Sequence, residues 1–121
     1  MTDDDTPLAV LRDRVASFCA EREWAQFHGP RDLAIGIVTE AAELLEIFRF
    51  RSEEESSRLL EDPQGHDRIE RELADVLFFV LRLAERHGID LTTAFLRKLA
   101  ANAERYPVEK ARGSNKKYDQ L

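Results

Sequence analysis

The sequence predicts an all-α protein built from four long helices. Apolar residues recur at helical spacing through most of the chain, and no segment alternates apolar and polar residues with a convincing period of two. Turn-forming Gly and Pro residues separate the helical stretches. A composition of 43% hydrophobic and 35% charged residues suits a small helical protein with one core, and 121 residues predict one domain.

Two helices are expected in the first half of the chain. The first begins at Pro7, a residue favoured in the first turn of a helix, and continues to Trp24. The sequence F-H-G-P at 27–30 interrupts it, and Pro30 can open a second helix that continues to about Phe48. Residues 1–6 are acidic, and we expect them to be disordered.

The second half predicts a short polar helix at 52–60, a third long helix at about 66–87 and a fourth at about 90–106. The turn D-P-Q-G precedes the third helix, and Gly88 is a typical C-terminal signal for it. Asp90 can cap the fourth helix, which ends before Pro107. We therefore expect a helical domain at 7–106 and a basic tail at 107–121 that contributes to a phosphate site or to an oligomer.

Charge and cysteine content exclude several classes of protein. A net charge of -6 argues against non-specific binding to nucleic acid, which needs a basic patch. The single cysteine, Cys19, cannot form an intrachain disulfide, so we expect it to be a core residue in a reducing compartment. The N-terminus lacks the apolar region of a signal peptide, and no apolar run approaches the ~20 residues of a membrane span. A cytoplasmic protein without membrane contact is the expectation.

Two pairs of acidic residues lie inside apolar helical stretches. Glu40 and Glu43 form E-A-A-E, and Glu72 and Asp75 form E-L-A-D. A spacing of three residues places both members of a pair on one face of a helix. If the two helices pack face to face, four carboxylates converge. Such a site suits a hard cation, and Mg²⁺ next to substrate phosphates is its common use.

Helical geometry places Glu40 among apolar side chains. At about 100° per residue, its neighbours within about 60° on the wheel are Leu33, Ile37, Leu44 and Ile47. A carboxylate in that position is costly unless it is paired or binds a metal. The spacing alone is weak evidence for a metal site, because a chain with 24 acidic residues contains several such pairs by chance. Arg68 and Arg71 also offer ordinary surface ion pairs to Glu72 and Asp75, four residues on.

The third helix is apolar over most of its circumference, at Ile69, Leu73, Val76, Leu77, Val80, Leu81, Leu83 and Ala84. A helix of this kind is buried on several sides. One short chain cannot cover it, so we expect a homo-oligomer.

Basic and aromatic residues offer contacts for a nucleotide. Lys98, Asn102 and Arg105 share a face of the fourth helix and could hold a polyphosphate, although a solvated face is the simpler interpretation. The tail adds Tyr106, Arg112, Lys116, Lys117 and Tyr118. The candidates for stacking on a nucleobase are Trp24, Phe27, Phe48, Phe50 and Phe79, and Trp24 with His28 is the best pair because it lies outside a regular apolar stripe.

Several common site motifs are absent. None of the three histidines follows a glutamate by three residues, as a di-iron bundle requires. The chain also lacks a P-loop, G-x-G-x-x-G, G-x-S-x-G and paired Cys/His zinc ligands.

The arrangement E-x-x-E…E-x-x-D resembles that of the MazG-like all-α nucleoside triphosphate pyrophosphatases. Four blocks, at 21–34, 72–80, 105–108 and 111–118, resemble the dCTP pyrophosphatase branch in particular. The similarity extends from about Leu8 to Leu121. It implies a four-helix bundle assembled as a dimer or a dimer of dimers.

The resemblance also implies site residues. Glu40, Glu43, Glu72 and Asp75 match the family's Mg²⁺ ligands, for which Mn²⁺ can substitute, and act in catalysis. Lys98 and Asn102 match phosphate contacts, and Trp24 and His28 match the base pocket. The branch tends to carry Trp at the position of Phe50 and Tyr at that of Phe79, so the preferred base stays open.

The resulting hypothesis is a Mg²⁺-dependent enzyme that hydrolyses dCTP, or a modified pyrimidine dNTP, to the monophosphate and pyrophosphate, and so cleans the nucleotide pool. Water would attack the α-phosphorus with a carboxylate as general base, while further metal ions, Lys98, and Arg105 or Arg112 would offset the charge on the pyrophosphate. The alternatives are the same scaffold acting on dUTP or another nucleotide, and a helical protein that binds nucleotide or metal without turnover.

Overall fold

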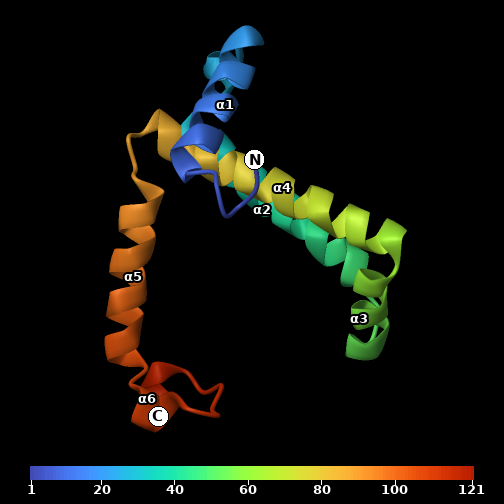
Figure 1. Ribbon diagram of the computed structural model, residues 1–121, viewed down its shortest axis with the longest axis vertical. Helices are drawn as coiled ribbons and strands as arrows, with labels where there is room; N and C mark the ends of the chain where they lie inside the picture. The colour runs from blue at the N-terminus through green and yellow to red at the C-terminus, as the bar shows by residue number, and fades with distance from the viewer. The chain divides into compact units, whose positions relative to one another are not determined.

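The computed structural model describes residues 1–121, and all of its regular structure is helical, which confirms the all-α prediction (Figure 1). The long helices are α1 (Leu8–Glu21), α2 (Pro30–Phe48), α4 (Pro63–Arg86) and α5 (Leu91–Arg105). The short ones are α3 (Glu53–Glu61), α6 (Val108–Ala111) and the 3-10 turns η1 (Trp24–Phe27) and η2 (Tyr118–Gln120). The chain divides into two compact units, Met1–Gly88 and Ile89–Leu121. Our predicted domain at 7–106 crosses this boundary and stays a prediction.

Helices α2 and α4 lie side by side and antiparallel at the centre of the first unit, with α3 connecting them (Figure 1). Helix α1 packs on α4. The core is built from these three helices and follows the contact between α2 and α4; its buried apolar side chains are Val15, Cys19, Leu33, Ile47, Ile69, Leu81 and Ala84. Gly65 is buried at the start of α4, where an added Cβ would collide with the carbonyl oxygen of Leu59 in α3.

Local capping explains where the central helices begin. Pro30 occupies the first turn of α2, as predicted. Helix α3 begins with a capping box, in which the Glu55 N–H donates to Ser52 Oγ (3.1 Å) and the Ser52 N–H donates to Glu55 Oε1 (3.3 Å). Asp62 caps α4 by accepting the Gly65 N–H at Oδ2 (3.0 Å).

Two predicted boundaries were wrong. Helix α4 begins at Pro63 rather than His66, because Asp62 and Pro63 start a helix there instead of forming a turn. Helix α1 ends at Glu21 rather than Trp24, since Glu23 adopts a left-handed conformation (φ 53°). Residues 1–6, which we expected to be disordered, include a turn in which the Asp5 N–H donates to the Thr2 carbonyl (3.2 Å).

The second unit contains α5, α6 and the C-terminal turn. Asp90 caps α5 as predicted, because its Oδ2 accepts the Thr93 N–H (3.0 Å). The tail contains α6 and η2, although its sequence has no periodic pattern. Both elements are too short to produce such a pattern. Tyr118 lies against the end of α5, with its ring 6.1 Å from that of Tyr106 and 4.8 Å from the Arg105 guanidinium carbon.

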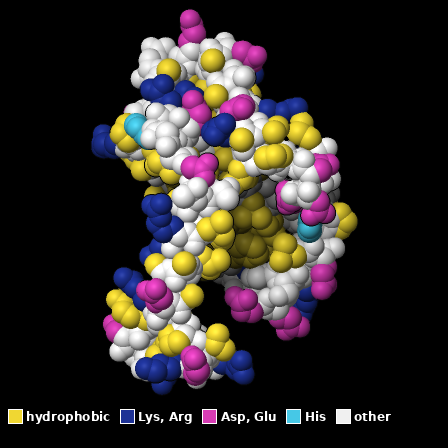
Figure 2. Space-filling view, turned by 60° about the vertical axis from the view of Figure 1, so that its left-hand side comes forward, with side chains coloured by type: hydrophobic (Ala, Val, Ile, Leu, Met, Phe, Trp, Pro, Cys, Tyr) yellow, Lys and Arg dark blue, Asp and Glu magenta, His cyan; other side chains and the backbone are white.

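Apolar side chains reach the surface of the first unit in large number (Figure 2). On α2 and α4 they include Ile35, Val38, Leu45, Leu73 and Leu77. The helices α2 and α4 therefore keep an uncovered apolar face in the isolated chain. No helix combines the length and hydropathy that crossing a membrane requires.

Candidate functional site

Three of the four predicted metal ligands lie together between α2 and α4. One carboxylate oxygen from each of Glu40, Glu43 and Glu72 falls within 4.8 Å of the others. Asp75 lies one turn beyond Glu72 and is near enough for its charge to raise the pKa of both Glu40 and Glu72. The helical wheel placed Glu40 among apolar side chains, and in the structure Glu40 is half-buried while Glu43 is exposed.

No basic side chain of the protein forms an ion pair with this cluster. Oε2 of Glu40 and Oε2 of Glu72 are buried and have no hydrogen-bond partner, and none of the four carboxylates forms an ion pair. Arg71 forms its ion pair with Asp67 (2.9 Å) and not with Asp75. The alternative in which Asp75 serves an ordinary surface ion pair with Arg71 is therefore excluded. Buried carboxylate oxygens without partners are rare in folded proteins.

Burial and mutual repulsion raise the pKa of two of these acids. The pKa of Glu40 is raised by burial first, then by the neighbouring Glu43 carboxylate and by the charges of Asp75 and Glu72. The pKa of Glu72 is raised by burial, by Glu43 and by Asp75, while Arg68 opposes the shift. The site therefore concentrates negative charge that a divalent cation would neutralise.

The donor set fits a hard divalent cation. All available ligands are carboxylate oxygens, the preference of Mg²⁺ and Mn²⁺, and two of them are buried and unsatisfied.

Gly36 places an aromatic ring beside the acids. Gly36 precedes Glu40 by one turn of α2, and Phe79 follows Asp75 by one turn of α4. An added Cβ on Gly36 would lie 2.6 Å from Cδ1 and Cε1 of Phe79, so the ring covers the backbone of α2 at this point. The antiparallel pairing of α2 and α4 thus puts Phe79 next to the acidic cluster.

A continuous series of edge-to-face ring contacts extends from Phe79 to His28. The ring centroids of Phe79 and Phe78 are 5.4 Å apart, and those of Phe78 and Phe18 are 5.9 Å apart. Phe18 contacts Trp24 at 5.6 Å, and Trp24 contacts His28 at 5.9 Å. Three predicted base-pocket residues, at positions 24, 28 and 79, therefore belong to one aromatic wall across α1, η1 and α4.

Phe50 stands apart from this wall. It follows α2 in a left-handed conformation (φ 65°), is 89% exposed, and lies beside the Arg49 guanidinium, whose carbon is 4.5 Å from the ring centre. Its predicted role in base stacking stays a prediction.

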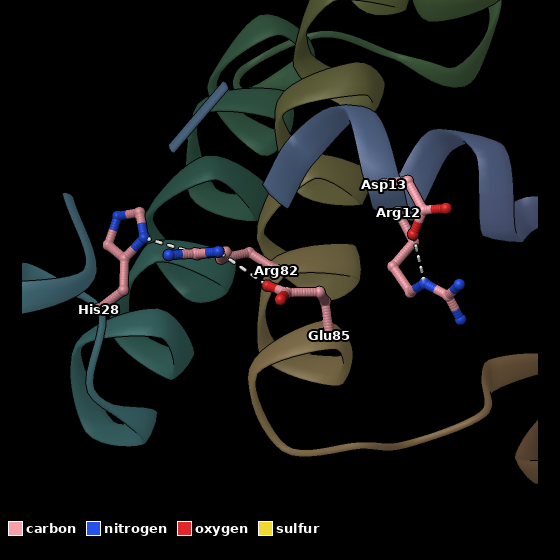
Figure 3. A network of polar contacts seen from close by, with 5 residues as sticks. All are labelled: Arg12, Asp13, His28, Arg82 and Glu85. Atoms are coloured by element: carbon pink, nitrogen blue, oxygen red, sulfur yellow. Dashed lines mark hydrogen bonds and ion pairs between the residues drawn. The ribbon is translucent and has the colours of Figure 1, made fainter. Parts of the chain in front are cut away.

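His28 is held by a buried arginine (Figure 3). The Arg82 Nε–H donates to Nδ1 of His28 (3.0 Å), and its Nη1–H donates to Glu85 Oε2 (2.7 Å). The pKa of His28 is lowered by burial and by the positive charges of Arg82 and Arg86, while Asp32 opposes the shift.

The predicted phosphate contacts belong to the second unit. Lys98, Asn102 and Arg105 lie on α5, where Lys98 is exposed and Asn102 is half-buried. Arg105 and Tyr106 contact Tyr118. Arg112 and Lys116 are exposed in the tail.

Sequence reasoning missed Gly36 and Arg82 as residues of this region. A lone glycine inside an apolar helix is a signal of close approach by a neighbour, and it could have identified Gly36. Arg82 interrupts the apolar run Leu81–Ala84, where a charge needs a buried partner.

Known proteins resemble this chain in sequence and in structure. A sequence model of the MazG-like family matches residues 35–121. Rat dCTP pyrophosphatase 1 is 42% identical and the human protein 41% identical over 114 residues, which is 94% of this chain and 67% of each relative. A crystal structure of a pyrophosphatase from Archaeoglobus fulgidus superposes with a TM-score of 0.77 and 36% identity, over 88% of this chain and 98% of that one.

Proposed function

The chain belongs to the MazG-like family, and from this membership we propose that it hydrolyses dCTP or a modified pyrimidine dNTP to the monophosphate and pyrophosphate. It is a nucleoside triphosphate pyrophosphohydrolase, as its relatives named dCTP pyrophosphatase 1 and the similar pyrophosphatase structure indicate. Removal of unwanted nucleotides from the cytoplasmic pool is the role that we propose for it.

The observation that carries the proposal is the pair of buried, unpartnered oxygens on Glu40 and Glu72. We assign Mg²⁺, with Mn²⁺ as a substitute, to these two residues together with Glu43 and Asp75. When bound, the ion would act as a Lewis acid on the triphosphate and lower the pKa of a water. The carboxylates themselves would orient that water, and one of them would take its proton as general base.

The remaining residues would bind the nucleotide. Trp24, His28 and Phe79 would contact the base through the aromatic wall, with Phe50 as a further stacking surface. The phosphates would contact Lys98, Asn102, Arg105, Arg112 and Lys116, together with Tyr106. Fixed cations of this kind stabilise charge that develops on the departing pyrophosphate.

A homo-oligomer is part of the proposal. The exposed apolar side chains of α2 and α4, such as Val38 (69% exposed) and Leu45 (66% exposed), support it. Burial of such a face against a second copy is the usual way to remove it from water. A dimer and a tetramer both satisfy this requirement.

A product assay tests the function. Purified protein is incubated with Mg²⁺ and a panel of dNTPs, and pyrophosphate and orthophosphate are measured separately. Pyrophosphate release, fastest with a cytosine nucleotide, is the expected result. Preference for dUTP would replace the proposed substrate, whereas orthophosphate alone or no product would reject the proposed reaction.

The matched control is a pair of glutamine variants on α2. Glu40→Gln removes a proposed metal ligand, whereas Glu46→Gln changes an exposed acid that pairs with Arg49 (3.6 Å). Only the first variant should lose pyrophosphate release.

A further inference from the structure

Arg82 is a buried cation in an otherwise apolar part of α4. The residue is 4% exposed, and its side chain has two polar partners, Glu85 and His28. A buried guanidinium is costly unless it is paired and hydrogen-bonded, so Glu85 offsets its charge and His28 satisfies its Nε–H. Because other side chains pack around Arg82, the direction of its Nε–H group is fixed. The His28 imidazole must therefore offer this group a hydrogen-bond acceptor.

This contact sets the protonation of His28. Nδ1 can accept the Arg82 hydrogen bond only if it carries no proton, so the ring is neutral and its proton is on Nε2. In Figure 3 the second ring nitrogen points away from Arg82. Arg82 and Arg86 from α4 also disfavour a charged imidazole, and only Asp32 from α2 acts in the opposite direction.

We infer that Arg82 is a positioning residue that makes His28 present one hydrogen-bond donor, and no acceptor, to the nucleobase. The inference rests on the proposed function, in which His28 contacts the base. Cytosine carries an acceptor at N3, whereas thymine and uracil carry N3–H, which is a donor. A histidine with only a donor to offer pairs with N3 of cytosine and opposes N3–H of the other two. Arg82 thereby acts on base selectivity without touching the substrate.

The first experiment measures the tautomer of His28 by ¹⁵N NMR of the histidine side chains near pH 7.5. The wild-type ring should show a proton on Nε2 and a bare Nδ1. Arg82→Met removes the hydrogen bond while keeping an apolar side chain of similar length, and it should give a mixture of tautomers and a higher His28 pKa. Arg86→Met removes a nearby positive charge without removing that hydrogen bond, and it should keep the wild-type tautomer.

The second experiment compares kcat/KM for dCTP and dUTP. Arg82→Met should reduce the ratio of the two values about tenfold, the effect of one net hydrogen bond, whereas Arg86→Met should leave the ratio unchanged. An equal loss on both substrates would show a merely structural role and overturn the inference.

The two experiments separate this inference from the proposed function. The NMR measurement needs no turnover, so a wild-type His28 protonated on Nδ1 overturns the inference even if Arg82→Met fails to fold. Absence of pyrophosphate release from every dNTP, with the expected tautomer present, rejects the proposed reaction and the selectivity role but leaves the Arg82–His28 geometry supported.

Discussion

Arg82 and His28 are 54 residues apart in the sequence, yet the Arg82 Nε–H donates to His28 Nδ1 over 3.0 Å. This hydrogen bond joins the segment between α1 and α2 to α4. It connects the stability of the first unit to the protonation of one imidazole.

The free energy of unfolding should therefore decrease as the solution becomes acidic. The pKa of native His28 lies below its ordinary value of 6.5, so the unfolded chain binds more protons between 6.5 and the native pKa. The contribution of His28 is fully present above pH 6.5 and is lost as the pH falls through that window. Urea unfolding from pH 8 to pH 5 measures it. His28→Gln removes the titration and should give a shallower decline; an identical pH dependence in both proteins contradicts the prediction.

Glu40→Gln should separate stability from activity. The substitution removes one negative charge from a cluster in which like charges repel, so the chelator-treated variant should unfold at a higher temperature than the chelator-treated wild type. Pyrophosphate release should fall by about 10²-fold or more, because a preorganised electrostatic contribution is lost. The helical circular dichroism signal should not change. Wild-type turnover in this variant would exclude Glu40 from the catalytic site.

With Mg²⁺ bound, the wild type should become more stable than Glu40→Gln. At Mg²⁺ concentrations about 100 times its dissociation constant, the wild type should gain about 2.7 kcal/mol in the free energy of unfolding, by mass action. Glu40→Gln should gain much less, and Glu46→Gln should behave as the wild type does. A thermal unfolding series in Mg²⁺ gives the comparison, and equal gains in all three proteins would place the ion elsewhere.

Gly36→Ala should displace the ring of Phe79. The added methyl group would lie 2.6 Å from two ring carbons, and overpacking of this kind typically costs about 1–3 kcal/mol. The KM for dCTP should rise, because the ring lies beside the acidic cluster. Urea unfolding and initial rates measure the two effects.

Two further variants control this prediction. Gly65→Ala also creates a collision, a closer one with a backbone atom, the carbonyl oxygen of Leu59, and it should lower stability without raising KM. Phe79→Leu should reduce the cost of Gly36→Ala, which a double-mutant cycle measures. Additive losses in the double variant would show that Gly36 and Phe79 are not coupled.

Val38→Asp should weaken the proposed oligomer. Val38 is 69% exposed on α2, and a buried charge at an apolar interface is strongly unfavourable. Light scattering coupled to size-exclusion chromatography should show a smaller species at micromolar concentration. Ser17→Asp, at an exposed polar position of α1, is the control and should keep the wild-type mass. A monomeric wild type would refute the oligomer directly.

Local signals predicted the helices well where the chain's own residues decide them. Pro30 after Gly29 defined the start of α2, and Asp90 defined that of α5. The start of α4 was missed because Asp62 and Pro63 can form a turn or begin a helix; in the structure Asp62 caps the helix and Gly65 packs closely on Leu59. The short α6 and η2 were missed because segments of three or four residues carry no periodic signal; in the structure Tyr118 of η2 contacts Arg105.

The candidate site was predictable only as far as local patterns within one helix reach. Periodicity showed that Glu40 faces apolar neighbours, and spacing showed that Glu72 and Asp75 share a face. The pairing of two helices was needed to bring these acids together. The contact of Arg82 with His28 spans the first unit and has no local sequence pattern, so only the folded chain reveals it.

Cys19 offers a direct way to follow opening of the folded chain. It is the single thiol of the protein, its side chain is fully buried, and burial raises its pKa, so thiol reagents have neither access nor thiolate in the native state. Alkylation at this one position would then be gated by transient separation of α1 from α4. Labelling rates would report that motion in the unmodified sequence, without an introduced probe.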